Sequence, residues 1–368
     1  MATAKTSRYQ LGFIGAGSAS RLHADAARPE GIPIAGFYDV DGDRAKVAAE
    51  RYGADLATDD LAELLDREDI PVIVVATPNV HHKPMAIAAM EAGKDVILEK
   101  PMGLTVEECD EIIAAKKRTG RRLQLGFVSR YSPVVKSARK QIEAGHIGRI
   151  YHAKATLLRR RGIPGLGRWF TTKRVAGGGV LMDLGVHLID LVLHYADRPK
   201  PERISGACTS LFGNPIDEYI HDEMWAGPPD PDGTFDVEDA AEALIRFKGG
   251  MTFALSVAWA SHLPEQAVRE QVVLFGEKGA LAAETWGGRL TLGRNDDASR
   301  QMIDVTPTRA AGDPWTSAWR AQHRHCREIF STKDAPVTAT AEHGRQAQAI
   351  VDGIYDSSEA GREVELES

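Results

Sequence analysis

The sequence has few cysteines and no excess of positive charge. Its cysteines, Cys109, Cys208 and Cys326, number only three among 368 residues and are far apart. This pattern argues against a disulfide framework or a cysteine-based zinc site and is typical of a reducing compartment. Lysine and arginine total 45 against 52 aspartate and glutamate residues, and the signs are interspersed. The chain therefore lacks the basic surface that holds nucleic acid or an anionic membrane, and we expect neither partner.

Long apolar runs are also missing near the start of the sequence. Residues 1–10 are polar, and the apolar run that follows contains Gly12, Gly15 and Gly17. We therefore expect neither a signal-peptide core nor a membrane span there, and a cytoplasmic location. With 43% hydrophobic and 26% charged residues, the composition is that of a folded protein, and the length predicts two domains.

The first third of the chain alternates short apolar runs with amphipathic stretches. Such alternation predicts repeated βαβ units, hence a doubly wound parallel sheet in an α/β domain over residues 1–126. The expected strands are continuously apolar, as parallel strands buried on both faces should be. They cover residues 11–14, 34–38, 72–76, 96–98 and 123–127. The expected helices cover residues 45–52, 61–66, 84–92 and 106–119.

After residue 127 the pattern changes. Two helices are expected, at residues 133–144 and 180–195, and period-2 segments then follow one another without helices between them. This segregation predicts an α+β domain with a mixed or antiparallel sheet over residues 127–368. The strands are expected at residues 151–158, 240–247, 251–260, 271–275, 280–283 and 289–292. Residues 214–236 are interpreted as a surface excursion, and residues 341–358 as a closing helix.

A glycine-rich loop follows the first strand. Gly15, Gly17, Ser18, Ala19 and Ser20 occupy a near match to the dinucleotide fingerprint, with Ser20 at the third small position. The next strand ends at Asp39, where an acidic side chain would accept hydrogen bonds from the adenosine ribose. Since a 2′-phosphate would be repelled there, the sequence favours NAD over NADP. Asp39 could equally be a solvated turn residue.

Polar residues gather at the ends of two later strands. Thr77, Pro78 and Asn79, with His82 close behind, follow one strand, and Glu99, Lys100 and Pro101 follow the next. In a doubly wound sheet, ligands bind beyond the carboxyl ends of the strands. Both tripeptides therefore fall where a bound nicotinamide is expected.

An apolar helix after Gly177–Gly179 carries four ionisable groups. Asp183, His187, Asp190 and His194 recur at spacings that place them on one stripe. Burying such a stripe against hydrocarbon is costly, so it either faces a polar cavity or is paired internally. The first arrangement would be catalytic and the second a structural Asp–His pair.

Together these motifs resemble the glucose–fructose oxidoreductase/inositol dehydrogenase/rhizopine-catabolism (Gfo/Idh/MocA) family of NAD(P)-dependent oxidoreductases. Besides the glycine loop and both strand-end tripeptides, the match includes His23, Gly126, Phe127, Arg130, Tyr131, Pro133 and the Asp183-x-Gly185-x-His187 motif. Ser20 and Tyr131 depart from the usual residues. The resemblance implies a Rossmann domain, then a domain whose large open sheet carries the substrate site and usually the subunit interface.

The resemblance also implies that Lys100, Asp183 and His187 form the catalytic group, and the chemistry supports these roles. An imidazole has a pKa near working pH and suits the base, His187. The Lys100 ammonium would stabilise the reacting oxygen, and Asp183 would orient the imidazole or bind a hydroxyl. Predicted cofactor contacts are Gly15, Gly17, Ser18, Ala19, Ser20, Asp39, Thr77, Pro78, Asn79, His82, Glu99, Lys100 and Arg130. Predicted substrate contacts are Lys100, Arg161, Trp169, Asp183 and His187.

We therefore predict an NAD-dependent oxidoreductase that interconverts a secondary hydroxyl and a ketone on a sugar, glycoside or cyclitol, as a homodimer or homotetramer. One alternative is a redox-assisted glycosidase or lyase that recycles NAD through a 3-keto sugar, and another is a non-catalytic NAD/sugar sensor. No metal site is predicted, because His323, His325 and Cys326 lack a fourth ligand at a recognised spacing and are interpreted as a helix-surface cluster.

Overall fold

A computed structural model describes residues 9–216, 219, 224–267, 269–286, 288–295, 300–307, 313–332 and 334–366. Contacts divide the chain into a first unit, Met1–Phe127 with Trp319–Arg345, and a second unit, Val128–Ala318 with Gln346–Ser368. The sequence placed everything after residue 126 in the second domain, and the segment 319–345 departs from that expectation. The reason is packing, because Cys326, on helix α9 (Pro314–Ser331), belongs to the buried core of the first unit.

The first unit contains the predicted doubly wound parallel sheet. Its strand order is β3-β2-β1-β4-β5-β6, and every pair is parallel. The order reverses between β1 and β4, which creates the crevice where such sheets bind ligands. The strands are β1 (Leu11–Ile14), β2 (Ile34–Tyr38), β3 (Leu56–Thr58), β4 (Val72–Val75), β5 (Asp95–Leu98) and β6 (Leu123–Leu125). The helices are α1 (Ser18–Ala27), α2 (Gly42–Tyr52), α3 (Leu61–Leu65), α4 (His82–Glu91) and α5 (Val106–Thr119).

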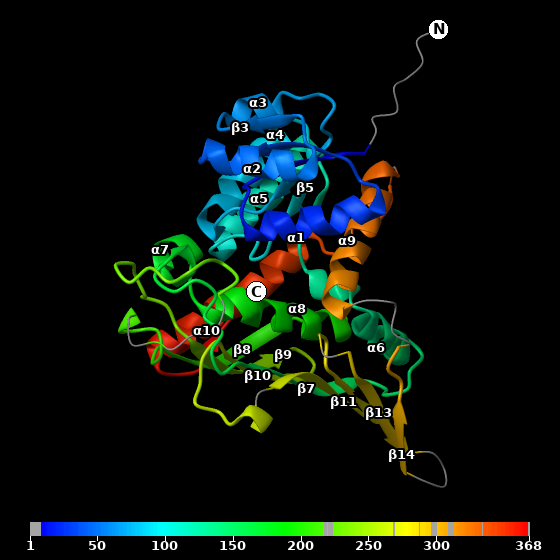
Figure 1. Cartoon of the computed structure of the whole chain (residues 1–368). Helices are drawn as coiled ribbons and strands as arrows, with labels where there is room; N and C mark the ends of the chain where they lie inside the picture. Colours follow the sequence, from blue (N-terminus) through cyan, green and yellow to red (C-terminus); the bar gives the residue numbers. More distant parts are fainter. Residues whose placement is uncertain are drawn as a thin grey trace. The chain divides into compact units, whose positions relative to one another are not determined.

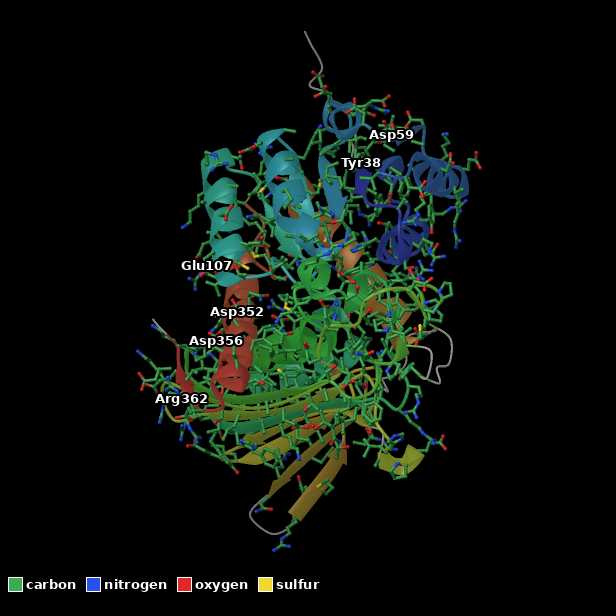
Figure 2. All side chains as sticks on the ribbon, turned by 90° about the vertical axis from the view of Figure 1, so that its left-hand side faces the viewer. Tyr38, Asp59, Glu107, Asp352, Asp356 and Arg362 are labelled. Carbon is green, nitrogen blue, oxygen red and sulfur yellow. The ribbon has the colours of Figure 1, made fainter. Side chains whose placement is uncertain are left out.

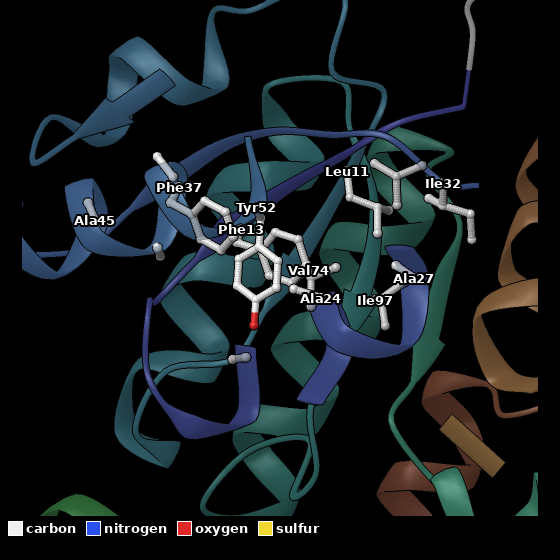
Figure 3. Packing of buried hydrophobic residues seen from close by; sticks show 14 of the residues in the cluster. Leu11, Phe13, Ala24, Ala27, Ile32, Phe37, Ala45, Tyr52, Val74 and Ile97 are labelled. Atoms are coloured by element: carbon white, nitrogen blue, oxygen red, sulfur yellow. The ribbon is translucent and has the colours of Figure 1, made fainter. Parts of the chain in front are cut away.

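Aromatic and aliphatic side chains of this sheet pack against small residues of α1 (Figure 3). Phe13 of β1 stacks on Phe37 of β2 with ring centroids 4.8 Å apart. Ala24 and Ala27 of α1 are fully buried in the same cluster. Because alanine lets a helix approach a sheet closely, α1 packs tightly against these strands. It begins at Ser18, immediately after the glycine turn that follows β1.

The second unit contains a nine-stranded mixed sheet in the order β14-β13-β12-β11-β7-β10-β9-β8-β15. Neighbours β7 and β10 run parallel, and the other pairs are antiparallel. This confirms the predicted fold class, although β8, β14 and β15 were not expected. The strands are β7 (Ile150–Leu158), β8 (Pro201–Thr209), β9 (Ala240–Phe247), β10 (Thr252–Ala258), β11 (Arg269–Gly276), β12 (Gly279–Ala283), β13 (Leu290–Asn295), β14 (Arg300–Asp304) and β15 (Val364–Glu365).

Helices α6 (Pro133–Glu143) and α8 (Val186–Tyr195) lie along one face of this sheet (Figure 1). Helix α10 (Ala341–Ala360) packs Ile354 against Gly206 of β8. A short helix, α7 (Lys173–Ala176), precedes α8, and the segment Lys173–Tyr195 is long and apolar enough to cross a membrane. However, 89% of its apolar window is buried in the protein, and a core helix passes the same test, so it is weak evidence for a membrane span.

Candidate active site

The glycine loop forms a tight turn between β1 and α1. Gly15 has φ +97°, and a side chain there would lie 2.7 Å from the Ala76 carbonyl oxygen, so only glycine fits. The buried Ser20 hydroxyl donates a 2.6 Å hydrogen bond to the Gly15 carbonyl oxygen, and this bond stabilises the turn. Gly17 precedes α1, is exposed, and has open space where a side chain would be. Ser18 and Ala19 open the helix.

Asp39 joins this loop to the end of β2. Its carboxylate accepts the Ala16 N–H at 2.8 Å and the Asp41 N–H at 3.0 Å. Tyr38 lies beside Asp59, the residue after β3 (Figure 2). Burial raises the pKa of Tyr38, and the carboxylates of Asp39, Asp59 and Asp60 raise it further. Three carboxylates therefore gather at this edge of the sheet, by β2 and β3.

The segment after β4 is held by its histidine. Buried His82 places Nδ1 2.6 Å from the Pro101 carbonyl and Nε2 3.0 Å from the Thr77 carbonyl, which ties the β4 and β5 ends together. Burial lowers the pKa of His82. Asn79 is also buried, and Pro78 is half-buried beside it. The Thr77 hydroxyl is buried and has no hydrogen-bond partner among the described residues.

Glu99 and Lys100 follow β5. Glu99 is buried and pairs with His23 of α1 at 2.9 Å. Its other oxygen accepts the Lys100 backbone N–H at 3.2 Å. Lys100 itself is half-buried. The structure thus brings Gly15, Asp39, Thr77, His82 and Lys100 to the carboxyl ends of strands in one unit, as predicted.

These residues fit a dinucleotide. The first turn of α1 contains no acidic residue, and Gly17 makes no side-chain cap, so the positive end of the helix dipole is available to a pyrophosphate. The open space at Gly17 would let the phosphates approach the backbone. The Thr77 hydroxyl is a further buried polar group for which the described residues supply no hydrogen-bond partner.

The second unit carries the other predicted catalytic residues. Asp183 lies in a π-helical turn, Leu181–Gly185, that leads into α8, and His187 follows in the first turn of α8. Single π-helical turns inside helices are frequent at functional sites. Both side chains are 6% exposed, and the indole N–H of Trp259 donates to Asp183 at 2.9 Å. This bond fixes the carboxylate one turn before the imidazole.

The start of this helix is held by a carboxylate that the sequence analysis missed. Buried Glu238 accepts the backbone N–H groups of Gly179 and Leu181, each at 2.9 Å, and the Tyr355 hydroxyl at 3.0 Å. A side chain on Gly178 would overlap the Tyr355 hydroxyl, and one on Gly179 would overlap the Glu238 backbone. The glycine run therefore lets two distant segments, at Glu238 and Tyr355, pack against the start of the helix that carries Asp183 and His187. Burial raises the pKa of Glu238.

The other half of the stripe is paired internally. Asp190 is 1% exposed and accepts two hydrogen bonds from Arg130, one of them at 2.7 Å, and a third at 3.3 Å from Arg198. Burial lowers the pKa of His194 to about 4. The ion pair with Asp190 explains why the Arg130 guanidinium can be buried. The predicted contact of Arg130 with the cofactor stays a prediction.

The predicted substrate residues Arg161 and Trp169 both belong to the segment between β7 and α7, where Trp169 begins a short 3-10 helix. Arg161 donates to the carbonyls of Arg160 and Ser261, and its guanidinium lies over the Tyr219 ring. Trp169 stacks on Phe170 with ring centroids 3.7 Å apart. Residues 224–234 bond to this loop through Ala226 and Asp230, so part of the expected surface excursion forms a second layer on it.

The sequence did not indicate the burial of His323 and Cys326 or the contact between Trp286 and His187. His323 and Cys326 are fully buried, so the expected helix-surface cluster is wrong; α9 turns these side chains into the first unit. Trp286 packs edge-on to His187 with ring centroids 6.3 Å apart, a contact that no local pattern indicated. Among the described residues, no group of three or more His, Cys, Asp or Glu side chains is arranged to hold a metal ion.

Comparisons with known proteins agree with the division of the sequence near residue 127. Residues 9–127 match the model of an oxidoreductase family with an NAD-binding Rossmann fold, and residues 135–282 match the GFO/IDH/MocA C-terminal domain. The chain is 29% identical over 368 residues to D-glucoside 3-dehydrogenase of Escherichia coli, with 98% of each chain covered. It is 31% identical over 265 residues to levoglucosan dehydrogenase of Pseudarthrobacter phenanthrenivorans, with 68% of each covered. A solved structure of levoglucosan dehydrogenase with NADH and levoglucosan superposes with a TM-score of 0.82 at 25% identity, covering 98% of this chain and 99% of that one.

Proposed function

The chain belongs to the Gfo/Idh/MocA family of oxidoreductases with an NAD-binding Rossmann fold, and from this premise we propose that it oxidises a secondary hydroxyl of a sugar, glycoside or cyclitol to a ketone. The observation that carries the proposal is the buried Asp183–His187 pair, set in a π-helical turn and clamped at its start by Glu238. A helix so restrained holds an acid and a base in fixed positions, which is what alcohol oxidation requires.

In this proposal, His187 removes the hydroxyl proton. The hydrogen bond from Trp259 orients the Asp183 carboxylate one turn before the imidazole. A nearby carboxylate favours the imidazolium that forms when the proton is taken up. Lys100 donates hydrogen bonds to the reacting oxygen and stabilises its developing charge. NAD, when bound, accepts the hydride that leaves the same carbon.

The cofactor would be held by the first unit. The residues proposed to hold it are the glycine loop, Asp39, and the segments after β4 and β5. Asp39 and the acidic edge at Tyr38 and Asp59 support a preference for NAD over NADP, because a 2′-phosphate would meet like charge there. The NAD-binding family and the NADH complex of levoglucosan dehydrogenase support the dinucleotide itself.

The substrate class is supported by the names of the relatives and by the chemistry of the residues. D-glucoside 3-dehydrogenase, levoglucosan dehydrogenase and D-apiose dehydrogenase are named for polyhydroxy substrates. Lys100, Asp183, His187 and Arg161 supply donors and acceptors that an apolar substrate would leave unpaired, at about 1 to 3 kcal/mol each. A ring with a hydroxyl on nearly every carbon satisfies them, and Trp169 would cover its less polar face.

We also propose that the sheet of the second unit forms the contact between subunits of a homodimer or homotetramer. Its strands β7, β8, β9 and β10 line a hollow of about 640 Å³ that includes Thr156, Leu244 and Ala254. Lys154 and Glu242 also line the hollow, so Thr156→Arg adds a bulky further cation to it. This variant should convert the oligomer to monomer in light scattering coupled to size-exclusion chromatography. An unchanged mass would remove the sheet from the interface. The cytoplasmic location stays a prediction.

The test is a screen of free sugars, cyclitols and glycosides with NAD, in which NADH absorbance and product mass are followed together. We expect net NADH and a product two hydrogens lighter than the substrate. Lys100→Met and His187→Asn should each lower kcat by about 100- to 10,000-fold, with NADH affinity nearly unchanged. Bond cleavage without net NADH would favour the redox-assisted glycosidase, and NAD binding without turnover of any compound would favour the sensor.

A further inference from the structure

Three buried ionisable side chains form a hydrogen-bonded chain behind Lys100. His23 of α1 places Nε2 2.9 Å from Glu99 Oε1 and Nδ1 3.0 Å from His323 Nε2. Both histidines are fully buried, and Glu99 is 6% exposed. All three belong to the first unit, although His323 comes from α9, far along the chain.

If both histidines are neutral, the hydrogen bonds of this group allow only one arrangement of its protons. The Glu99 carboxylate only accepts, so Nε2 of His23 carries the proton that it donates. A neutral His23 then has a bare Nδ1, which accepts the Nε2 proton of His323. Burial and the neighbouring His23 lower the pKa of His323 well below its usual value. Its remaining nitrogen, Nδ1, is buried and bonded to nothing in the described part of the chain, as suits a nitrogen without a proton.

The hydrogen bonds that link His323, His23 and Glu99 continue to the backbone of Lys100. The second oxygen of Glu99 accepts the Lys100 N–H at 3.2 Å. Gly126 leaves room for this carboxylate, because any side chain there would overlap Glu99 Oε1. On the other side of Lys100, the Pro101 carbonyl is held by His82 at 2.6 Å. The lysine backbone is therefore fixed on both sides by buried histidines.

We propose that His323 is a positioning residue: by donating to Nδ1 of His23 it holds the ring so that the Nε2 proton faces Glu99, and so keeps Glu99 and the Lys100 backbone in place for the reaction. Glu99 fixes the proton on Nε2, whereas His323 fixes the orientation of the ring. Without His323, the buried Nδ1 of His23 would lose its donor, and the hydrogen bond from Nε2 to Glu99 would weaken as the ring shifts. The catalytic consequence rests on the proposed function of Lys100, whereas the hydrogen bonding of His23 does not.

The test compares three variants of the full chain. His323→Leu removes the donor, and His323→Gln keeps an amide N–H in a similar place. Gln322→Leu is the control, because Gln322 is the preceding residue of α9, is equally buried, and has a side-chain amide without a hydrogen bond among the described residues. The readouts are imidazole ¹⁵N NMR of His23, NADH affinity by fluorescence titration, and kcat and KM on a substrate found in the screen.

We expect His23 to be protonated at Nε2 in the parent protein, with its Nδ1 accepting a hydrogen bond. In His323→Leu the ¹⁵N shift of Nδ1 should move toward that of a nitrogen without a hydrogen bond, and in His323→Gln it should return toward the parent value. His323→Leu should lower kcat about 10-fold, with KM and NADH affinity within about 2-fold, and His323→Gln should recover most of the loss. A His23 with a bare Nε2 in the parent protein would overturn the inference, as would an unchanged Nδ1 shift in His323→Leu. An equal loss of kcat in Gln322→Leu would also overturn it. If the parent oxidises no sugar, the proposed function fails, and the NMR result still decides whether His323 holds the His23 ring.

Discussion

Replacing Arg130 with methionine should destabilise the second unit by about 3 kcal/mol. Its guanidinium bonds to both carboxylate oxygens of Asp190, and the two side chains are 5% and 1% exposed. Removing one partner of a buried ion pair leaves an uncompensated charge, at about 3 to 5 kcal/mol. The lower end applies because Arg198 remains 3.3 Å from the same carboxylate. For a unit of about 200 residues, this loss lowers Tm by roughly 6 to 12 °C.

Differential scanning calorimetry would measure this change, with Arg149→Met as the matched control. Arg149 pairs with Glu277 in the same unit, but both side chains are more than half exposed, so the same substitution should change stability by at most about 1 kcal/mol. The double variant Arg130→Met/Asp190→Leu should recover part of the loss, because no buried charge is then left alone.

The Arg130→Met variant also distinguishes between two possible roles of this residue, the ion pair and the cofactor contact. If its ion pair is its role, Arg130→Met should leave NADH affinity within about 2-fold of the parent once folded protein is compared. If the predicted cofactor contact is its role, affinity should fall by about 10-fold or more while Tm changes little. A Tm within about 2 °C of the parent would refute the reasoning from burial and pairing.

Three other measurements test the site and its supports. NADP should bind at least about 10-fold more weakly than NAD in calorimetric titration, and Asp39→Ser should narrow that ratio; equal binding in the parent would contradict the role of Asp39. Glu238→Gln should destabilise the second unit by about 1 to 3 kcal/mol in urea unfolding, because an amide nitrogen would face the Gly179 N–H; unchanged stability would remove the clamp. His194, whose pKa burial lowers to about 4 from 6.5, should contribute stability that is full above pH 6.5 and lost as the pH falls toward 4. His194→Gln should therefore flatten the decline in stability between pH 7 and 4.5, and an equally steep decline in the variant would show that other groups cause it.

The fold was predictable wherever burial imposed a simple period. Strands β1, β4 and β5 are buried on both faces and read as continuous apolar runs, so their bounds differ little from those expected. Strand β8 was missed because only Pro201 and Ile204 along it are fully buried, which leaves no alternation to read. Strands β3 and β15 have three and two residues, too few for any period.

The site was predictable in its local motifs but not in its supports. The glycine loop and the residues after β4 and β5 lie within short stretches whose chemistry is visible in sequence. Glu238, Tyr355 and His323 act on residues far away in the chain, and their contacts depend on how strands and helices pack. The predicted surface position of His323 failed for that reason, because a local pattern gives the spacing of side chains on a helix but not the face that becomes buried.

The four ionisable residues on one stripe of the helix that carries Asp183 and His187 show how one sequence pattern can serve two purposes. Its spacing left open whether it faces a polar cavity or is paired internally, and the structure divides it. Asp190 is neutralised by two guanidinium groups, which anchor the middle of α8 against its neighbours. Asp183 instead receives a hydrogen bond from the indole of Trp259, which orients the carboxylate. It lies in the π-helical turn Leu181–Gly185, and single turns of this kind are frequent at functional sites. The catalytic role is therefore proposed for Asp183 and His187, at the start of the helix, and the anchoring role for Asp190, further along it.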